Sequence, residues 1–272
     1  MAIAPSRRRN PEGRMALREH LVELRRRLTR AGLGVLAAAV GGWFLYEPLF
    51  EAATRPIREI QERRGAGSAS INFGDPFSPF NLKLQGALII GVVISSPVWL
   101  YQLWAFITPG LTRKERRSSL GFLAAAVPLF LGGAGLAWLV LPKAIEFLNE
   151  FVPDGGSTFI DAPSYFSFVT RVVLAFGIAF VIPVVLVCLN LVGLLKGRTL
   201  VRHWRIIVFS CFLFAAIATP TPEATSMCVL AGAMCVLFAV AVGICLVVDR
   251  RRARRSDEPT YEDLDDDEAS PL

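Results

Sequence analysis

Side chains that commonly carry out catalysis or bind metals are scarce in this sequence. Histidine occurs only twice, as His20 and His203, and no zinc-protease HExxH, serine-hydrolase GxSxG or nucleotide-binding P-loop pattern is present. The five cysteines lie in apolar runs and none forms a CxxC pair. They are expected to pack as small hydrophobic residues. The sequence therefore predicts that the protein is not an enzyme and binds no metal or cofactor.

Charged residues are also scarce, and they leave long apolar runs between them. They make up 19% of the 272 residues, against 53% apolar residues, and the mean hydropathy is +0.49. About 20 helical residues cross a hydrocarbon core of roughly 30 Å. The sequence predicts an all-α polytopic membrane protein, with six transmembrane helices in a domain spanning 31–248, the fifth being short. The runs are Ala31–Phe50, Leu84–Ile107, Ser118–Pro142, Ala162–Leu195, Ile206–Pro222 and Ala224–Val248.

The basic residues are distributed unevenly around these runs. Of the 29 Lys and Arg, 22 flank the predicted spans on the side of the two termini and six lie on the opposite side. Because cytoplasmic loops carry the excess of Lys and Arg, we expect a multi-pass protein of the cell inner (plasma) membrane with both termini cytoplasmic. Residues 1–30 are predicted to be a retained cytoplasmic segment, and the acidic residues 249–272 a disordered cytoplasmic tail. Basic residues that rim a membrane predict no nucleic-acid partner.

Prolines and polar segments suggest the shape of the bundle. Pro97, Pro128 and Pro183 lie inside the second, third and fourth runs, where each removes a backbone donor and either kinks its helix or only adjusts packing. Kinks in these helices would make the bundle concave. The outer segments 51–81 and 143–161 are expected to cover its outer face, the first as a helix up to Arg64 followed by a break.

Two acidic residues interrupt basic cytoplasmic stretches. Leucines recur at helical spacing from Leu17 to Leu28, which predicts an amphipathic helix that can lie along the membrane surface. Glu23, on another face of this helix, either pairs with Arg27 four residues on or binds a ligand. Glu115 lies in the basic stretch between the second and third spans. Two carboxylates brought together on the inner surface would suit bidentate binding of guanidinium groups.

Two longer patterns carry a family resemblance. Residues 20–28 read HLVELRRRL, residues 101–111 read YQLWAFITPGL, and residues 115–117 read ERR. In this order they resemble the signatures of the TatC family, the core subunit of the twin-arginine protein translocase. The length and the six predicted spans agree with that family, and the resemblance covers about residues 15 to 250.

The resemblance implies a receptor for signal peptides with paired arginines, in a translocase that exports folded proteins by using the proton-motive force. It implies that Glu23 and Glu115 contact the arginines and that the apolar part of the signal peptide inserts along the concave face of the bundle. Four further residues would shape the same cytoplasmic patch: Leu24, Arg25, Phe106 and Arg117.

The same family works in the lipid bilayer with the single-span subunits TatA and usually TatB, and we expect these partners and other copies of the chain itself. Residues 175–183 (AFGIAFVIP) resemble the family's fourth span, but Val181 stands where a glutamate is common. We hypothesise that this altered contact shifts partner docking toward hydroxyl groups near the hairpin of the last two spans. These are Thr219, Thr221, Thr225 and Ser226.

A multi-span transporter for a small solute or ion is the alternative function. Such proteins keep ionisable groups near the middle of the membrane. Here Glu47 lies near the outer end of the first run, and Arg171 lies nine residues into the fourth. Arg171 either extends toward the outer surface or pairs with an outer acidic residue such as Asp161. The sequence therefore favours the translocase over the transporter.

Overall fold

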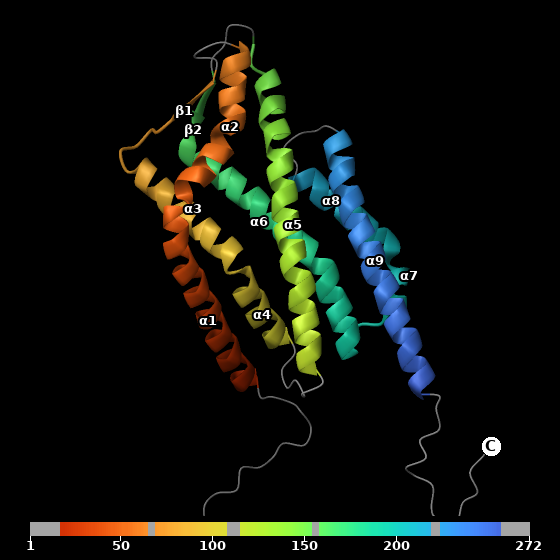
Figure 1. The fold of residues 1–272 in the computed structure, drawn as a ribbon. Coiled ribbons are helices and arrows are strands. Elements are labelled where there is room, and N and C mark those ends of the chain that lie inside the picture. The colour runs from red at the N-terminus through yellow and green to blue at the C-terminus, as the bar shows by residue number, and fades with distance from the viewer. Residues whose placement is uncertain (1–16, 65–68, 108–114, 154–157, 219–223, 257–272) are drawn as a thin grey trace, which may run out of the picture.

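In the residues that the structure describes, the regular elements are helices and one pair of short strands (Figure 1). The computed structural model describes residues 17–64, 69–107, 115–153, 158–218 and 224–256. The helices are α1 (Leu17–Phe44), α2 (Tyr46–Arg64), α3 (Ser78–Ile94), α4 (Ser96–Ile107), α5 (Glu115–Glu150), α6 (Ala162–Val192), α7 (Gly197–Arg202), α8 (Trp204–Ala218) and α9 (Ala224–Ser256). The strands are β1 (Ala69–Asn72) and β2 (Thr158–Asp161).

The long helices confirm the prediction of an all-α polytopic membrane protein. In the described residues, parts of α5, α6 and α9 are long and apolar enough to cross a membrane. The bent pairs α1–α2 and α3–α4 pass the same test together, and α8 is a shorter apolar helix. These elements coincide with the six predicted runs, although the number of spans stays a prediction. Large apolar side chains such as Leu139 and Ile217 face outward, as expected for contact with lipid.

Both bent pairs break just before a proline. The helix axis turns by 71° between α1 and α2 and by 61° between α3 and α4. Pro48 has no N–H to donate to the carbonyl of Phe44, where α1 ends, and Pro97 follows the break at Ser95. Of the two alternatives considered for Pro97, a kink or an adjustment of packing, the kink is the one present. Pro128 and Pro183 lie inside the continuous helices α5 and α6.

Two helices extend beyond their predicted bounds. The leucines from Leu17 to Leu28 belong to α1 itself, so they continue the first long helix instead of forming a separate helix along the surface. The C-terminal helix α9 runs to Ser256, past the predicted end of the span at Val248. Arginines at a helix C-terminus interact favourably with the helix dipole, so the basic run after Asp249 is compatible with continued helix. Residues 257–272 lie outside the described part of the chain.

The two outer segments meet in a small sheet. β1 and β2 pair in parallel, with Ala69 opposite Thr158 and Asn72 opposite Asp161. This sheet and α2 lie at one end of the molecule, and the first residues of α1 and the last of α9 lie at the other (Figure 1). The two segments therefore lie together at one end of the molecule, and that this end faces outward stays a prediction. Asp161 also caps α6: its side chain accepts hydrogen bonds from the backbone N–H (3.0 Å) and the hydroxyl (2.6 Å) of Ser164, which lower the pKa of its carboxyl group.

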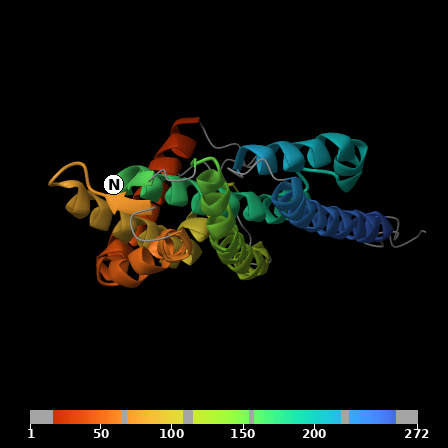
Figure 2. The ribbon, with the colours of Figure 1, turned by 90° about the horizontal axis from the view of Figure 1, so that it is seen from above.

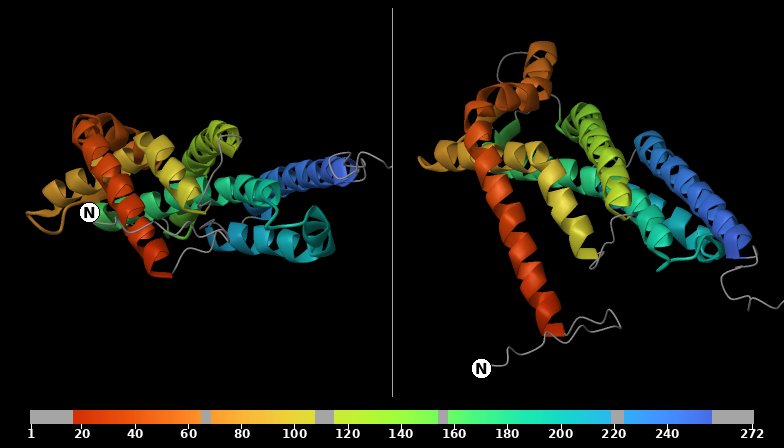
Figure 3. Two further views of the ribbon diagram at one scale, coloured as in Figure 1. Left: turned by 90° about the horizontal axis from the view of Figure 1, so that it is seen from below. Right: turned by 60° about the horizontal axis from the view of Figure 1, so that its bottom comes forward.

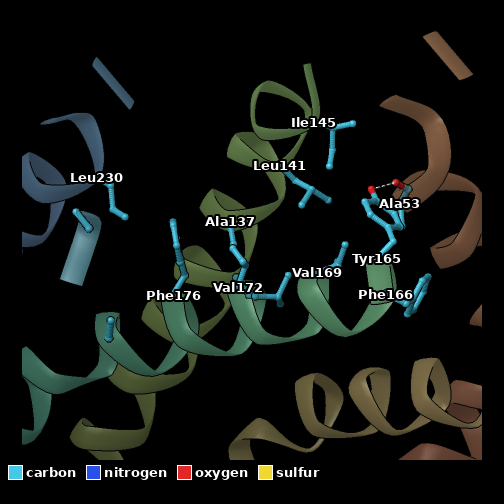
Figure 4. Close-up of a cluster of buried hydrophobic side chains, with 14 of the residues drawn as sticks. Ala53, Ala137, Leu141, Ile145, Tyr165, Phe166, Val169, Val172, Phe176 and Leu230 are labelled. Atoms are coloured by element: carbon cyan, nitrogen blue, oxygen red, sulfur yellow. Dashed lines mark hydrogen bonds between the residues drawn. The ribbon is translucent and has the colours of Figure 1, made fainter. Parts of the chain in front are cut away.

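The main core lies where α5 crosses α6 (Figure 4). A Cβ on Gly133 would lie 2.6 Å from the carbonyl oxygen of Phe176, so only glycine allows the two backbones to approach this closely. The hydroxyl of Tyr165 donates a hydrogen bond to the carbonyl of Ala53 and ties α6 to α2 (Figure 4). Viewed from above, α1–α4 gather at one end of an elongated outline and α7–α9 at the other (Figure 2). Helix α6 crosses obliquely between the two groups (Figure 3).

Candidate functional site

The start of α1 packs against α4, and two of the sequence signatures meet there. Glu23, Leu24 and Arg25 lie on α1, and Phe106 lies at the end of α4. Arg25 is exposed and Leu24 is 38% exposed. This surface lies at the end of the molecule that holds the first residues of α1 (Figure 1). The structure thus brings together four of the six residues predicted to bind a signal peptide.

Only one of the two carboxylate oxygens of Glu23 accepts hydrogen bonds within the described residues. Arg27 donates to Glu23 Oε1 from Nε (2.9 Å) and from Nη2. The Glu23 side chain is only 19% exposed. Its second oxygen, Oε2, is buried and has no hydrogen-bond partner among the described residues. The predicted pair with Arg27 is therefore formed, through one of the two carboxylate oxygens.

A cavity of about 270 Å³ opens beside this pair, between α1 and α4. We call it the α1–α4 groove. Its lining residues are Leu24, Arg27, Leu28, Ala31, Trp99, Gln102, Leu103 and Phe106.

Gln102 is a residue of the groove that the sequence analysis did not single out. Its Oε1 atom is buried and has no partner among the described residues, as for Glu23 Oε2. Leaving such atoms unpaired is costly, so each one calls for an explanation. The available signal was a polar side chain inside the second signature, on an otherwise apolar helix. Burial, which the pattern could not show, distinguishes Gln102 from an ordinary surface glutamine.

The ring of Phe106, which lines the groove, stacks on the ring of His20. Their centroids are 4.5 Å apart and the ring planes are inclined by 21°. This contact joins the first described turns of α1 to the last turn of α4.

Glu115 and Arg117 are placed only through the backbone. Helix α5 begins at Glu115, at the same end of the molecule as the start of α1 (Figure 1). Residues 108–114 and the side chains of the first turns of α5 lie outside the described part. The predicted contact of Glu115 and Arg117 with the same ligand therefore stays a prediction.

Of the five residues predicted to bind partner subunits, the structure describes the side chain of Val181 alone. Val181 is 5% exposed and packs in a cluster with Leu100, Phe130 and Cys188. Thr219 and Thr221 lie outside the described residues. Thr225 and Ser226 lie in the first turn of α9, and only their backbone is described. The docking role of all five residues stays a prediction.

No metal centre is found in the described residues, because no three His, Cys, Asp or Glu side chains come together there. The groove has apolar walls and contains the buried Oε1 atom of Gln102. The buried Oε2 atom of Glu23 belongs to the side chain that pairs with Arg27, and Arg27 also lines the groove. Such a site suits a ligand that carries several donors on a planar cation and an apolar continuation.

Comparison with known proteins gives consistent matches. The profile of the family described as "Sec-independent protein translocase protein (TatC)" matches residues 19–232. The chain is 49% identical over 253 residues to the Sec-independent protein translocase protein TatC of Xylanimonas cellulosilytica, covering 93% of this chain and 90% of that one. It is 31% identical over 244 residues to TatCy of Bacillus subtilis, covering 89% and 93% of the two chains. A crystal structure described as the twin-arginine translocase receptor TatC in DDM has a TM-score of 0.68 at 29% identity, covering 83% of this chain and 99% of the other.

Proposed function

The chain belongs to the TatC family and is a Sec-independent protein translocase protein, and from this premise we propose that the α1–α4 groove is its receptor site for twin-arginine signal peptides. The observation that carries the proposal is the pair of unpartnered buried acceptors, Glu23 Oε2 and Gln102 Oε1. A guanidinium group has five N–H donors and no acceptor, so it supplies what both atoms lack. Arg27 occupies only the other oxygen of Glu23.

The same geometry supports a preference for arginine over lysine. The planar fork of a guanidinium donates to two acceptors at once, whereas an ammonium group is a compact point charge on a flexible chain. A charge-assisted hydrogen bond in a partly buried site is also stronger than one in water. We propose that Glu115 contributes a second carboxylate from the start of α5, as the family resemblance implies.

A second cavity supports the proposed path for the apolar part of the signal peptide. It has a volume of about 300 Å³ and lies among α3, α5 and α6, with walls that include Ile90, Leu131, Trp138, Phe166 and Val173. Nearly all of its lining is apolar, as burial of a hydrophobic segment requires. We propose that the segment following the arginines inserts along this concave surface.

We further propose the setting in which the receptor works. The chain is a multi-pass membrane protein, and the excess of basic residues near its termini supports an inner-membrane location with both termini cytoplasmic. TatA, TatB and other copies of the chain are the proposed partners, and the proton-motive force is the proposed energy source. The matched relatives are named as translocase proteins, a transport role; we propose that the chain itself catalyses no reaction. The alternative of a small-solute transporter is not favoured by these relatives.

Site-specific photocrosslinking tests the receptor role. A photoreactive residue replaces Leu103, which lines the groove, and leaves Glu23, Gln102 and Phe106 intact. Inverted membrane vesicles are then offered signal peptides that differ only in having two arginines or two lysines. We expect strong crosslinking to the arginine peptide and at least tenfold less to the lysine peptide.

A control probe at Val236 measures non-specific contact, since this side chain is 62% exposed on α9, in the group of helices at the other end of the outline (Figure 2). Equal crosslinking of both peptides at Leu103, or crosslinking no stronger than at Val236, would refute the groove as the receptor site.

A further inference from the structure

One face of α6 is left uncovered by the helices that pack against it. Helix α5 covers the face that carries Val169, Val172 and Phe176 (Figure 4). On the opposite side, exposed residues recur at helical spacing, and they change in character along the helix. They are Ser164, Arg171, Ile178 and Ile182.

Arg171 is a charged residue on this uncovered face, inside a stretch apolar enough to span a membrane. It lies nine residues after the start of α6 at Ala162, or about 13 Å along the helix axis. In the described part of the chain it takes part in none of the ion pairs or hydrogen bonds. The pairing with Asp161 considered from the sequence is not formed, because Asp161 accepts hydrogen bonds from Ser164.

Polar groups continue from the outer end of α6 down to Arg171. One turn before Arg171, the hydroxyl of Ser167 accepts a hydrogen bond from Gln85 Nε2 of α3 (3.3 Å), and Thr170 accepts another (3.4 Å). Beyond Arg171 the face is apolar, with Ile178 53% and Ile182 43% exposed. Lipid headgroups and water can therefore follow the polar part of the face, but not the apolar part.

An uncovered guanidinium at this depth needs an anion. A charged side chain surrounded by hydrocarbon is costly, so arginines in spans pair with an anion or extend to the headgroup layer. Helix α6 runs obliquely across the bundle (Figure 3), so a length of about 13 Å along its axis corresponds to a smaller depth below its outer end. At that level the membrane itself supplies phosphate groups, which match the guanidinium fork in a bidentate manner.

We propose that Arg171, with the hydroxyl of Ser167 beside it, binds the phosphate of an anionic phospholipid from the leaflet opposite the two termini. The acyl chains of that lipid then lie on the apolar part of the same face, along Ile178 and Ile182. Charge complementarity and the gradient from polar to apolar residues both match a phospholipid. A carboxylate on a partner's transmembrane helix would satisfy the charge but not the polar stretch above it.

Native mass spectrometry of the full-length protein tests this site. The delipidated protein in detergent is titrated with phosphatidylglycerol and, separately, with zwitterionic phosphatidylcholine. Wild type should retain phosphatidylglycerol more tightly, and Arg171→Gln should bind the first phosphatidylglycerol about fivefold more weakly. Arg171→Lys should fall between the two. The matched control is Arg58→Gln, which removes an exposed arginine from α2, at the same end of the molecule but outside the bundle (Figure 1).

The outcomes separate this site from its alternatives. Unchanged phosphatidylglycerol binding by Arg171→Gln, or an equal loss in Arg58→Gln, would overturn the proposal. If Arg171→Gln keeps the lipid but loses a copurifying single-span subunit, the anion is a partner's carboxylate and the lipid site is wrong. Arg171→Lys protects the test against misfolding, since it keeps the cation and should elute as wild type does in size-exclusion chromatography.

Discussion

Glu23 and Asp249 are two carboxylates at the same end of the molecule, and the fold uses them differently. In the α1–α4 groove, Glu23 presents one oxygen to Arg27 and keeps the other unpartnered beside a cavity. At the α6–α7–α9 junction, both oxygens of Asp249 are used. Oδ1 accepts from Asn190 Nδ2 (2.8 Å), and Oδ2 accepts from the backbone N–H of Gly197 (2.7 Å).

The hydrogen bonds of Asn190 and Asp249 join α6, α7 and α9 at this junction. Asn190 is fully buried and also donates to the carbonyl of Leu195 (2.8 Å), so it fixes the chain just after α6. A Cβ on Gly197 would lie 3.1 Å from both Asp249 Oδ2 and the backbone of α9, which leaves little room for any other residue. Asp249 therefore joins α9 to α7 through hydrogen bonds at both of its oxygens, whereas Glu23 has one oxygen without a partner among the described residues. The junction also holds a buried oxygen without a partner among the described residues, Asn190 Oδ1, so the contrast concerns the two carboxylates and the cavity next to Arg27.

Among the substitutions considered, Glu23→Gln should cause the largest loss of signal-peptide affinity. The change keeps the size of the side chain but removes the charge, and hydrogen bonds to charged groups contribute about 1.5–3 kcal/mol. Affinity for a twin-arginine signal peptide should therefore fall by about tenfold to a hundredfold, measured by fluorescence anisotropy with the protein in nanodiscs.

Glu59→Gln is the matched control, because Glu59 forms the same kind of pair, with Arg55, on α2 at the opposite end of the molecule. Equal losses in the two variants would mean that the unpartnered oxygen of Glu23 has no special role.

Replacing Asp249 by Ala should give the reverse result. The N–H of Gly197 and one hydrogen of the Asn190 amide lose their acceptor, at a cost of about 2 kcal/mol in the free energy of unfolding. Unfolding in mixed detergent micelles measures this loss. Signal-peptide affinity of the folded variant should stay within about twofold of wild type. A large loss of affinity with unchanged stability would place Asp249 in the binding site and abolish the distinction between the two carboxylates.

Gln102→Leu sharpens the comparison, because stability and binding should move in opposite directions. Removing a buried oxygen that has no partner is neutral or slightly stabilising, whereas losing its bond to the incoming guanidinium costs about 1 kcal/mol, or about fivefold in affinity. Thermal unfolding and peptide binding are measured on the same samples. In Gln85→Leu, by contrast, two formed hydrogen bonds are lost, so stability should fall while affinity is kept. A Gln102→Leu variant that loses stability and keeps its affinity would contradict the assignment.

Sequence patterns were sufficient where composition and local sterics decide the structure. The apolar runs predicted the long helices, and Pro97 made a break between α3 and α4 one of two alternatives. Pro48 carried the same signal for the end of α1, but the break was not predicted because the run 31–50 is apolar apart from Glu47. The end of α9 was placed too early because helix formation continues after the residues become charged.

Contacts between distant segments were less predictable. The pairing of β1 with β2 depends on how α2, α5 and α6 place two loops, which no local pattern records. Glu23 and Phe106 were predicted to share a site through the family resemblance, and they lie on the two helices that form the groove, which Phe106 lines. Gln102 was missed because its significance is a buried, unpartnered oxygen. Only packing in three dimensions creates that property.

His20→Ala should have the smallest effect on the groove. It removes the ring that stacks on Phe106 at 4.5 Å but leaves both unpartnered oxygens in place. Aromatic ring pairs contribute about 0.5–1.5 kcal/mol, and this one is partly exposed, so affinity should fall by about threefold. His20→Phe keeps a stacking ring and should bind as wild type does, when both variants are titrated with the same labelled peptide. If His20→Phe loses as much affinity as His20→Ala, the imidazole itself contacts the ligand and the groove has a third polar group. If neither variant changes the affinity, the spacing of α1 and α4 is set by the apolar walls alone.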